Sequence, residues 1–109
     1  MDLGNAEASR YRFDDVEVDV RRRRVLRNGA ELALEPKAHA VLVELLRHAG
    51  DVVARDALLD AVWGTTFEGY EHNVNTHINR LRSKIETDPA NPRYVLTVRG
   101  VGYRFTDQR

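Results

Sequence analysis

The chain has 109 residues, no cysteine and a formal net charge of zero; 42% of its residues are hydrophobic and 31% are charged. This composition is typical of a globular protein, and about 100 to 150 residues is the usual size of one domain. The composition excludes disulfides and thiolate zinc sites, and no apolar run approaches the roughly 20 residues of a membrane-spanning helix. We therefore expect one soluble cytoplasmic domain at residues 11–106, no membrane partner, and tails at residues 1–10 and 107–109.

Basic and acidic residues are distributed unevenly along the chain. Residues 1–71 hold ten Lys or Arg against fourteen Asp or Glu, a net of −4, whereas residues 72–109 hold seven against three, a net of +4. The local potential at a contact, and not the total charge, governs binding to a polyanion. The zero total therefore leaves a nucleic-acid partner open, and it places the expected basic surface in the last third of the chain.

The first third of the chain predicts a small antiparallel sheet of four strands. Apolar and charged residues alternate through residues 12–20, and the alternation returns at residues 24–27 and 31–34. Between the last two segments, Asn28-Gly29 supplies the positive φ angles that a tight hairpin turn needs, which fixes the expected register there. The run Arg21–Arg24 falls in the preceding turn, where it is either a solvated loop or a nucleic-acid contact.

Three helices are predicted next. Pro36 suits the first turn of a helix, and apolar residues at helical spacing follow it toward Gly50, which suits a C-terminal cap. Residues 52–54 are expected to link this helix to a second one at residues 56–63. The third helix is expected from about Glu71 to Ile85, because its apolar residues are spaced by four, three and four: Val74, Ile78, Leu81 and Ile85.

The outward face of the third helix is predicted to be polar. At about 100° per residue, the side opposite the apolar stripe carries hydrogen-bond donors and acceptors: His72, Asn73, Thr76, Asn79, Arg80 and Ser83. Asn, Thr and Arg pair with base edges in the DNA major groove, which is about as wide as a helix. The hairpin that follows at residues 94–105 adds two arginines and two hydroxyls: Thr97, Arg99, Tyr103 and Arg104. Helix and hairpin together predict a DNA-binding unit, in which the helix lies in the major groove and the hairpin, called the wing, contacts the neighbouring minor groove or phosphates.

These elements predict an α+β fold, a winged helix-turn-helix with an N-terminal four-stranded antiparallel sheet, three helices and a C-terminal β-hairpin wing. The most specific stretch is residues 97–105, Thr-Val-Arg-Gly-Val-Gly-Tyr-Arg-Phe, at its distance from the run His77-Ile-Asn-Arg-Leu-Arg82. Further stretches match the same pattern: Leu34–Ala38, Val52–Asp56, Leu58–Leu59, Val62–Gly64, Val74 and Lys84–Ile85. With these residues the chain resembles the DNA-binding effector domain of the OmpR/PhoB family of bacterial transcription regulators over residues 11–105.

The resemblance implies sequence-specific binding to double-stranded DNA for transcription regulation. The helix at about residues 71–85 would lie in the major groove and the wing at residues 94–105 at the minor groove. The implied base contacts are Asn75, Thr76, Asn79, Arg80 and Arg99. The implied phosphate contacts are His72, His77, Arg82, Lys84, Thr97 and Tyr103.

Two further partners follow from the resemblance. Tandem dimers on DNA are one expectation, and RNA polymerase is another. The segment before the third helix either contacts the polymerase or only connects two helices: Thr65, Thr66, Phe67, Glu68, Gly69 and Tyr70. Trp63 is expected in the core.

The chain departs from the family pattern on the third helix. An acidic residue is common in the family where this chain has Asn75, and a basic one where it has Asn79 and His72. The family's base preference and number of phosphate contacts are therefore not expected to carry over. The family's N-terminal receiver domain, with its phosphorylatable Asp, is missing as well. We expect either an excised output domain of a two-component response regulator or a regulator driven by something other than phosphotransfer.

Two other classes of function compete with DNA binding. An enzyme or a metal site would need a nucleophile and a base, or clustered ligands, but His72 and His77 are five apart, off the spacing that stacks ligands on one helix face. We expect no catalysis, cofactor or metal. A winged helix that binds protein is the closer alternative. It would need exposed Leu, Phe, Met or Tyr anchors where the third helix has Asn, Thr, His and Arg.

Overall fold

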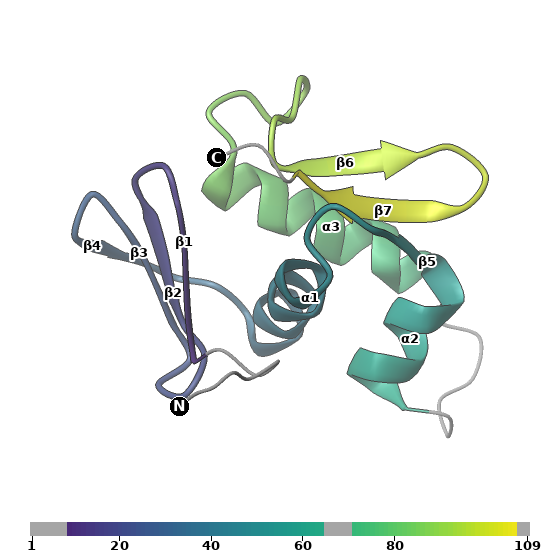
Figure 1. The fold of residues 1–109 in the computed structure, drawn as a ribbon, viewed down its shortest axis with the longest axis horizontal. Coiled ribbons are helices and arrows are strands. Elements are labelled where there is room, and N and C mark those ends of the chain that lie inside the picture. Colours follow the sequence, from purple (N-terminus) through teal and green to yellow (C-terminus); the bar gives the residue numbers. More distant parts are fainter. Residues whose placement is uncertain (1–8, 65–70, 107–109) are drawn as a thin grey trace.

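The computed structural model describes residues 9–64 and 71–106, and it begins with a four-stranded antiparallel sheet (Figure 1). The strands pair in chain order: β1 (Arg10–Phe13), β2 (Val16–Asp19), β3 (Arg24–Arg27) and β4 (Ala30–Leu32). One face of this sheet is apolar, because Phe13, Val16, Val18 and Val25 are at most 1% exposed. The predicted four-stranded sheet is confirmed.

Tight turns determine the register of this sheet. Asn28 and Gly29 have φ angles of 52° and 82°, and Arg27 is paired with Ala30 across them. Both central residues are therefore left-handed, as a two-residue hairpin turn requires, and the register predicted from this pair is confirmed. Arg23 also has a positive φ, 55°, in the turn between β2 and β3, where the Arg22 backbone N–H donates to the Asp19 carboxylate at 3.1 Å.

The three predicted helices are α1 (Pro36–Arg47), α2 (Arg55–Trp63) and α3 (Glu71–Ile85). Pro36 stands in the first turn of α1, where its missing N–H costs nothing. In Figure 1, α1 lies between the N-terminal sheet and α2, and it packs against both α2 and α3. None of the helices in the described part of the chain is both long enough and apolar enough to cross a membrane.

Residues 52–54 link α1 to α2 as predicted, and they also form a strand that the sequence did not predict. This strand, β5 (Val52–Ala54), pairs with β7 (Gly102–Phe105), and β7 pairs with β6 (Val95–Val98), all antiparallel. A Cβ built on Gly102 would lie 2.1 Å from the Val53 carbonyl oxygen, so the pairing depends on glycine there. Three residues with only Val53 buried are too short for the alternation that indicates a strand.

One hydrophobic core joins the two sheets. Phe13 of β1 packs against Phe105 of β7 and against Tyr94, with ring centroids 4.9 Å and 4.8 Å apart. The Tyr94 hydroxyl donates a hydrogen bond to the Asp14 carboxylate in the β1–β2 turn. Burial and this hydrogen bond raise the pKa of Tyr94 to about 12, so the hydroxyl keeps its proton at neutral pH.

A buried carboxylate fixes the start of the hairpin relative to the end of α3. Glu86 is only 3% exposed and directly follows α3. Its carboxylate accepts hydrogen bonds from the backbone N–H groups of Arg93, Tyr94 and Val95, at 2.7, 3.0 and 2.9 Å. Because a charged acceptor satisfies three backbone donors at once, the chain returns from the helix to β6 along a defined path.

Candidate nucleic-acid interface

Helix α3 has one buried face and one polar exposed face. Its apolar residues Val74, Ile78, Leu81 and Ile85 are at most 1% exposed, as their spacing predicted. The side chains of residues 71–73, which include the phosphate candidate His72, lie outside the described part of the structure, and so do residues 65–70. The described exposed residues are all polar: Asn75, Thr76, Asn79, Arg80, Ser83 and Lys84.

The base candidate Arg80 is tied to the linker that precedes α1. Its Nη1 lies 2.7 Å from Oε1 of Glu35, and more than half of each side chain is exposed, 53% and 56%. The Ser83 hydroxyl donates to the Arg80 carbonyl at 2.7 Å, so it is engaged with the helix backbone. The Arg80 guanidinium therefore stands at the surface with one nitrogen engaged. No sequence pattern indicated this contact, because Glu35 belongs to a different element.

The phosphate candidate Arg82 points to the hairpin instead of away from the molecule. Its Nε and Nη2 donate to the Val95 carbonyl at 3.0 and 2.7 Å, and Nη2 also donates to the Thr97 hydroxyl at 2.8 Å. Its guanidinium also lies over the Tyr103 ring, 5.9 Å from the centroid. Burial lowers the pKa of Arg82, yet an arginine stays charged at neutral pH. Its hydrogen bonds offset part of the cost of burying that charge and join α3 to β6.

Two more candidates take part in the same junction. The Tyr103 hydroxyl, on β7, donates a hydrogen bond to Oδ1 of Asn75 on α3. Tyr103 is 4% exposed, so only a small part of the residue reaches the surface. The amide NH2 of Asn75 remains a donor after its oxygen has accepted from Tyr103. Asn75, Arg82, Thr97 and Tyr103, which came from two separate candidate sets, thus form one helix-to-hairpin junction.

The hairpin carries Arg99 at its exposed tip. Arg99, Gly100 and Val101 are all exposed, and the Val101 backbone N–H donates to the Val98 carbonyl at 2.9 Å to close the turn. Gly100 has a φ of 78°, which explains glycine at this position. Among the residues that the structure describes, the Arg99 side chain has no hydrogen bond or ion pair. The backbone of the hairpin therefore determines where Arg99 lies.

His77 lies at the N-terminal half of α3 in a partly buried aromatic contact. Its ring meets the Trp63 ring edge-on, with centroids 5.2 Å apart, and its Nε2 lies 4.0 Å from Oε1 of Glu35. Trp63 itself is partly buried against the core, with the Lys37 ammonium 5.7 Å from its ring centroid. Within α3, His77 thus lies between the packed and the exposed faces.

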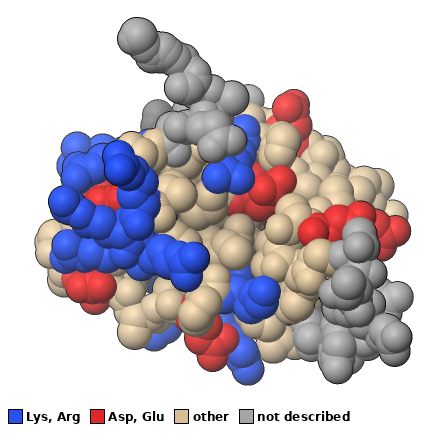
Figure 2. All heavy atoms as spheres, turned by 90° about the horizontal axis from the view of Figure 1, so that it is seen from below, with Lys and Arg blue, Asp and Glu red and all other residues tan. Residues whose placement is uncertain are grey.

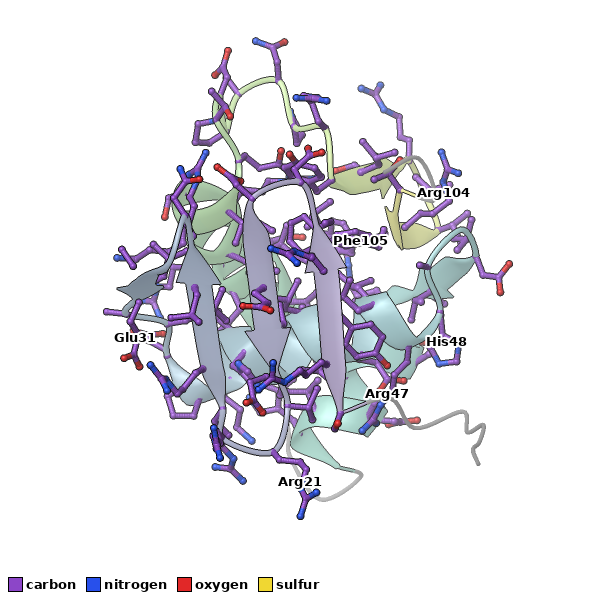
Figure 3. All side chains as sticks on the ribbon, turned by 60° about the vertical axis from the view of Figure 1, so that its left-hand side comes forward. Arg21, Glu31, Arg47, His48, Arg104 and Phe105 are labelled. Carbon is purple, nitrogen blue, oxygen red and sulfur yellow. The ribbon has the colours of Figure 1, made fainter. Side chains whose placement is uncertain are left out.

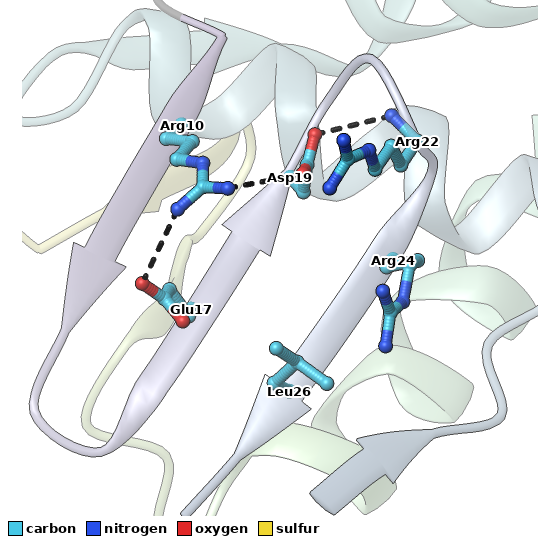
Figure 4. A pocket seen from close by; sticks show the side chains of 6 residues that line it. All are labelled: Arg10, Glu17, Asp19, Arg22, Arg24 and Leu26. Atoms are coloured by element: carbon cyan, nitrogen blue, oxygen red, sulfur yellow. Dashed lines mark hydrogen bonds and ion pairs between the residues drawn. The ribbon is translucent and has the colours of Figure 1, made fainter. Parts of the chain in front are cut away.

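The run Arg21–Arg24 lies away from α3, at one end of the N-terminal sheet. Figure 3 shows Arg21 at the turn between β2 and β3, pointing away from the sheet. Beside this turn, Arg10 contacts Glu17 and Asp19 at 3.9 and 3.7 Å in a shallow pocket on the outer face (Figure 4). Figure 2 shows Lys and Arg gathered in one large group in the view from below, with Asp and Glu interspersed.

Comparisons with known proteins identify the family. Residues 29–105 match the model of the family described as "Transcriptional regulatory protein, C terminal". The chain belongs to this family. It is also similar in structure to response regulator DrrB of Thermotoga maritima, an OmpR/PhoB homolog, with a TM-score of 0.81 and 38% identity over 90% of this chain and 44% of that one. The winged-helix fold and the OmpR/PhoB type that the sequence predicted are thereby confirmed.

Other relatives of the domain are DNA-binding proteins by name. The DNA-binding response regulator MtrA of Mycobacterium tuberculosis is 49% identical over 90 residues, which are 83% of this chain and 40% of MtrA. The RstA DNA-binding domain of Klebsiella pneumoniae, solved in complex with the RstA box, has a TM-score of 0.80 and 34% identity over 91% of this chain and 98% of that one. The chain thus spans about two fifths of the curated MtrA proteins and nearly all of the RstA domain.

Proposed function

We propose that this domain binds double-stranded DNA sequence-specifically, as the output part of a transcription regulator. The observation that carries the proposal is the junction through which Arg82 and Tyr103 hold the hairpin against α3. This junction holds the polar face of α3 and the wing that carries Arg99 in a fixed relative position. A helix of this kind fits the major groove while the wing reaches the adjacent minor groove. The RstA DNA-binding domain, which has the same fold and was solved in complex with the RstA box, supports binding to DNA.

We assign roles according to the exposure and the contacts of the side chains that the structure describes. Asn79, Arg80 and Thr76 stand on the exposed face and are proposed to read base edges, with Asn75 donating through its amide. Lys84 and His77 are proposed to meet phosphates, as is His72. Arg99 is proposed to enter the minor groove. We propose that Arg82, Thr97 and Tyr103 mainly orient the wing, because they form the helix-to-hairpin junction. From that position they are proposed to contact the DNA backbone as well.

The alternative of a protein-binding winged helix has less support. A protein interface is centred on exposed aromatic or aliphatic anchors. The large hydrophobic side chains exposed in the described part of the chain are Val52 and Val101, 46% and 52% exposed, and neither belongs to α3. From residue 74 onward, the exposed residues of α3 are instead amides, hydroxyls and cations. This polarity favours a nucleic acid over a protein as the partner of the helix.

A salt series tests the proposal. Binding to random-sequence and to selected duplexes is measured between about 50 and 200 mM salt. Neutralising about five or six phosphates would give a slope of about −4.5 to −5.4 for log affinity against log salt concentration.

Two substitutions separate base contacts from phosphate contacts. Arg80→Ala should cost about 1 to 3 kcal/mol of binding free energy on the selected site and relax the base preference of the domain. Lys84→Ala should weaken all sequences alike and flatten the slope by about one. Binding that does not change with salt would reject the proposal.

We further propose that the domain acts within a larger assembly. The chain spans 40% of MtrA, so the sensing part of such a regulator would lie elsewhere in a longer protein. The family resemblance implies two partners. One is a second copy of the domain, bound to an adjacent half-site, and the other is RNA polymerase, contacted by residues 65–70. Selection of bound sequences from random duplex DNA would report half-site spacing and orientation, and therefore tests the pairing directly.

A further inference from the structure

A carboxylate stands beside the base-reading arginine of α3. Glu35 lies in the linker between β4 and α1, and its Oε1 accepts a hydrogen bond from Arg80 Nη1 at 2.7 Å. Both side chains line one groove between this linker and α3, together with Ser83 and Lys84. An acidic group at the edge of a DNA-binding face opposes nonspecific binding, because it repels phosphates. The position of the Glu35 carboxylate at this face therefore requires an explanation.

Glu35 is presented from a fixed point of the backbone. It is the N-cap residue of α1, with φ −62° and ψ 150°, and it is followed by Pro36, which restricts its conformation further. Its carbonyl accepts the His39 backbone N–H at 2.9 Å. The side chain makes no capping hydrogen bond, so the carboxylate is available to Arg80 and costs the helix nothing. The position of Glu35 therefore constrains where the guanidinium can lie.

The contact leaves one particular edge of the guanidinium available. Only Nη1 of Arg80 is engaged with Glu35; within the part of the chain that the structure describes, its Nε and Nη2 donate to no other group. These two nitrogens carry parallel N–H groups that match the O6 and N7 acceptors of guanine in the major groove. Arg82, two residues along, uses the same Nε and Nη2 pair to bind the Val95 carbonyl.

We propose that Glu35 is a specificity-determining residue, which positions Arg80 so that its Nε–Nη2 edge meets a guanine. This inference rests on the proposed DNA binding. An ion pair this exposed stabilises the fold only slightly, so its value lies in holding the arginine in one orientation before DNA arrives. The negative charge also penalises complexes in which Arg80 does not gain a base, which increases discrimination. Glu35 would thus lower affinity for random DNA and raise the preference for guanine at one position.

The test compares Glu35→Ala and Glu35→Gln with a matched control, Glu31→Ala. Glu31 is exposed as well, but its carboxylate pairs with Arg24, 3.6 Å away on the neighbouring strand, so it does not touch α3. Each protein is titrated with the selected duplex and with duplexes that replace each guanine in turn. Glu35→Ala should reduce discrimination at one guanine by about fivefold, within the range of a single bidentate base contact. Glu35→Gln, which keeps an acceptor, should recover part of that loss, and Glu31→Ala should change nothing.

A double-mutant cycle decides whether Glu35 acts through Arg80. In the Arg80→Ala background, Glu35→Ala should cause no further loss of discrimination, because the group that it positions is gone. If Glu35→Ala instead raises affinity for all duplexes equally and leaves discrimination unchanged, Glu35 is only a repulsive charge and the inference is overturned. Failure of the wild-type protein to prefer any sequence would overturn the proposed function itself. Thermal unfolding of each variant confirms that the fold is intact.

Discussion

The two sheets of this domain differ in how they are built. The N-terminal sheet joins consecutive strands through tight turns, and its outer face is covered by exposed ion pairs such as Arg10 with Glu17 and Asp19. The C-terminal sheet pairs β5, which lies between α1 and α2, with β7, which follows all three helices, and it is bound to α3 through Arg82 and Tyr103. The first sheet therefore depends on local turns, whereas the second depends on long-range packing that also shapes the proposed interface. Substitutions in the C-terminal sheet should therefore reduce the free energy of unfolding more than substitutions in the N-terminal sheet.

The largest effect is expected from Gly102→Ala. The added Cβ would lie 2.1 Å from the Val53 carbonyl oxygen and 2.9 Å from Ala54 Cα, so β5 and β7 must separate. We expect a loss of about 3 kcal/mol in the free energy of unfolding, as for other severe overpacking. Urea denaturation measures it. Gly100→Ala is the control, because no atom beyond its chain neighbours lies within 4 Å of its Cβ position and only the φ of 78° would be strained in alanine; it should cost about 1 kcal/mol.

Arg82→Ala should have the second largest effect. It removes three hydrogen bonds between α3 and β6 and leaves the Val95 carbonyl without that charged donor, so we expect about 2 kcal/mol of destabilisation. DNA binding should weaken on every sequence, because the wing loses its support. Arg82→Lys should recover little, since one ammonium cannot reproduce the two-nitrogen contact.

Arg80→Ala provides the contrast, because its guanidinium faces outward. It should leave the free energy of unfolding unchanged within about 0.5 kcal/mol while relaxing base preference. Equal loss of stability in Arg80→Ala and Arg82→Ala would contradict the different roles that we assign to the two arginines. Denaturation curves and duplex titrations on the same protein samples measure both quantities.

A smaller effect is expected where α1 meets the N-terminal sheet. His39 of α1 is 7% exposed, and neither ring nitrogen has a hydrogen-bond partner among the described residues. Burial, and then the charge of Arg23, lower the pKa of His39 below its ordinary value of 6.5. The unfolded chain therefore binds a proton more readily than the folded one, and stability should fall as pH falls below about 6.5, by at most about 1.4 kcal/mol per pH unit.

Denaturation curves at pH 5.5 and 7.5 measure this loss of stability. His39→Phe should remove most of it, because the group that binds the proton is gone. His48→Gln, which replaces a side chain that is 51% exposed and lies beside Glu44, should leave the His39 contribution in place. If His39→Phe and the wild type lose stability equally between the two pH values, other groups are responsible.

The smallest effect is expected on the outer face of the N-terminal sheet. Arg10 is 62% exposed, and its two ion pairs at 3.9 and 3.7 Å face solvent. Arg10→Ala should therefore change the free energy of unfolding by less than about 0.5 kcal/mol, and added salt should reduce that difference. A loss above about 1.5 kcal/mol would show that the charged residues in Figure 4 act as a cooperative network, and it would remove the contrast between the two sheets.

Much of the fold could be predicted because it follows from neighbouring residues. Asn28-Gly29 determines a turn from its own backbone preferences, and the apolar spacing of α3 marks both its length and its buried face. The strand β5 could not be found in this way, since its three residues are all apolar, so polar and apolar residues do not alternate, and its partner lies on β7. Its presence became evident only from the pairing of Val53 with Tyr103.

The candidate site divides along the same line. The polar face of α3 and the arginine of the wing tip are properties of the sequence, because helical period and a turn at Gly100 place them at the surface. The sequence does not determine where the side chains of Arg80 and Arg82 point, although both are arginines two positions apart on the same helix. Packing of the hairpin against α3 turns Arg82 inward, and the end of the β4–α1 linker brings Glu35 to Arg80 from 45 residues away. Such contacts depend on which surfaces meet after folding, and local preference does not encode them.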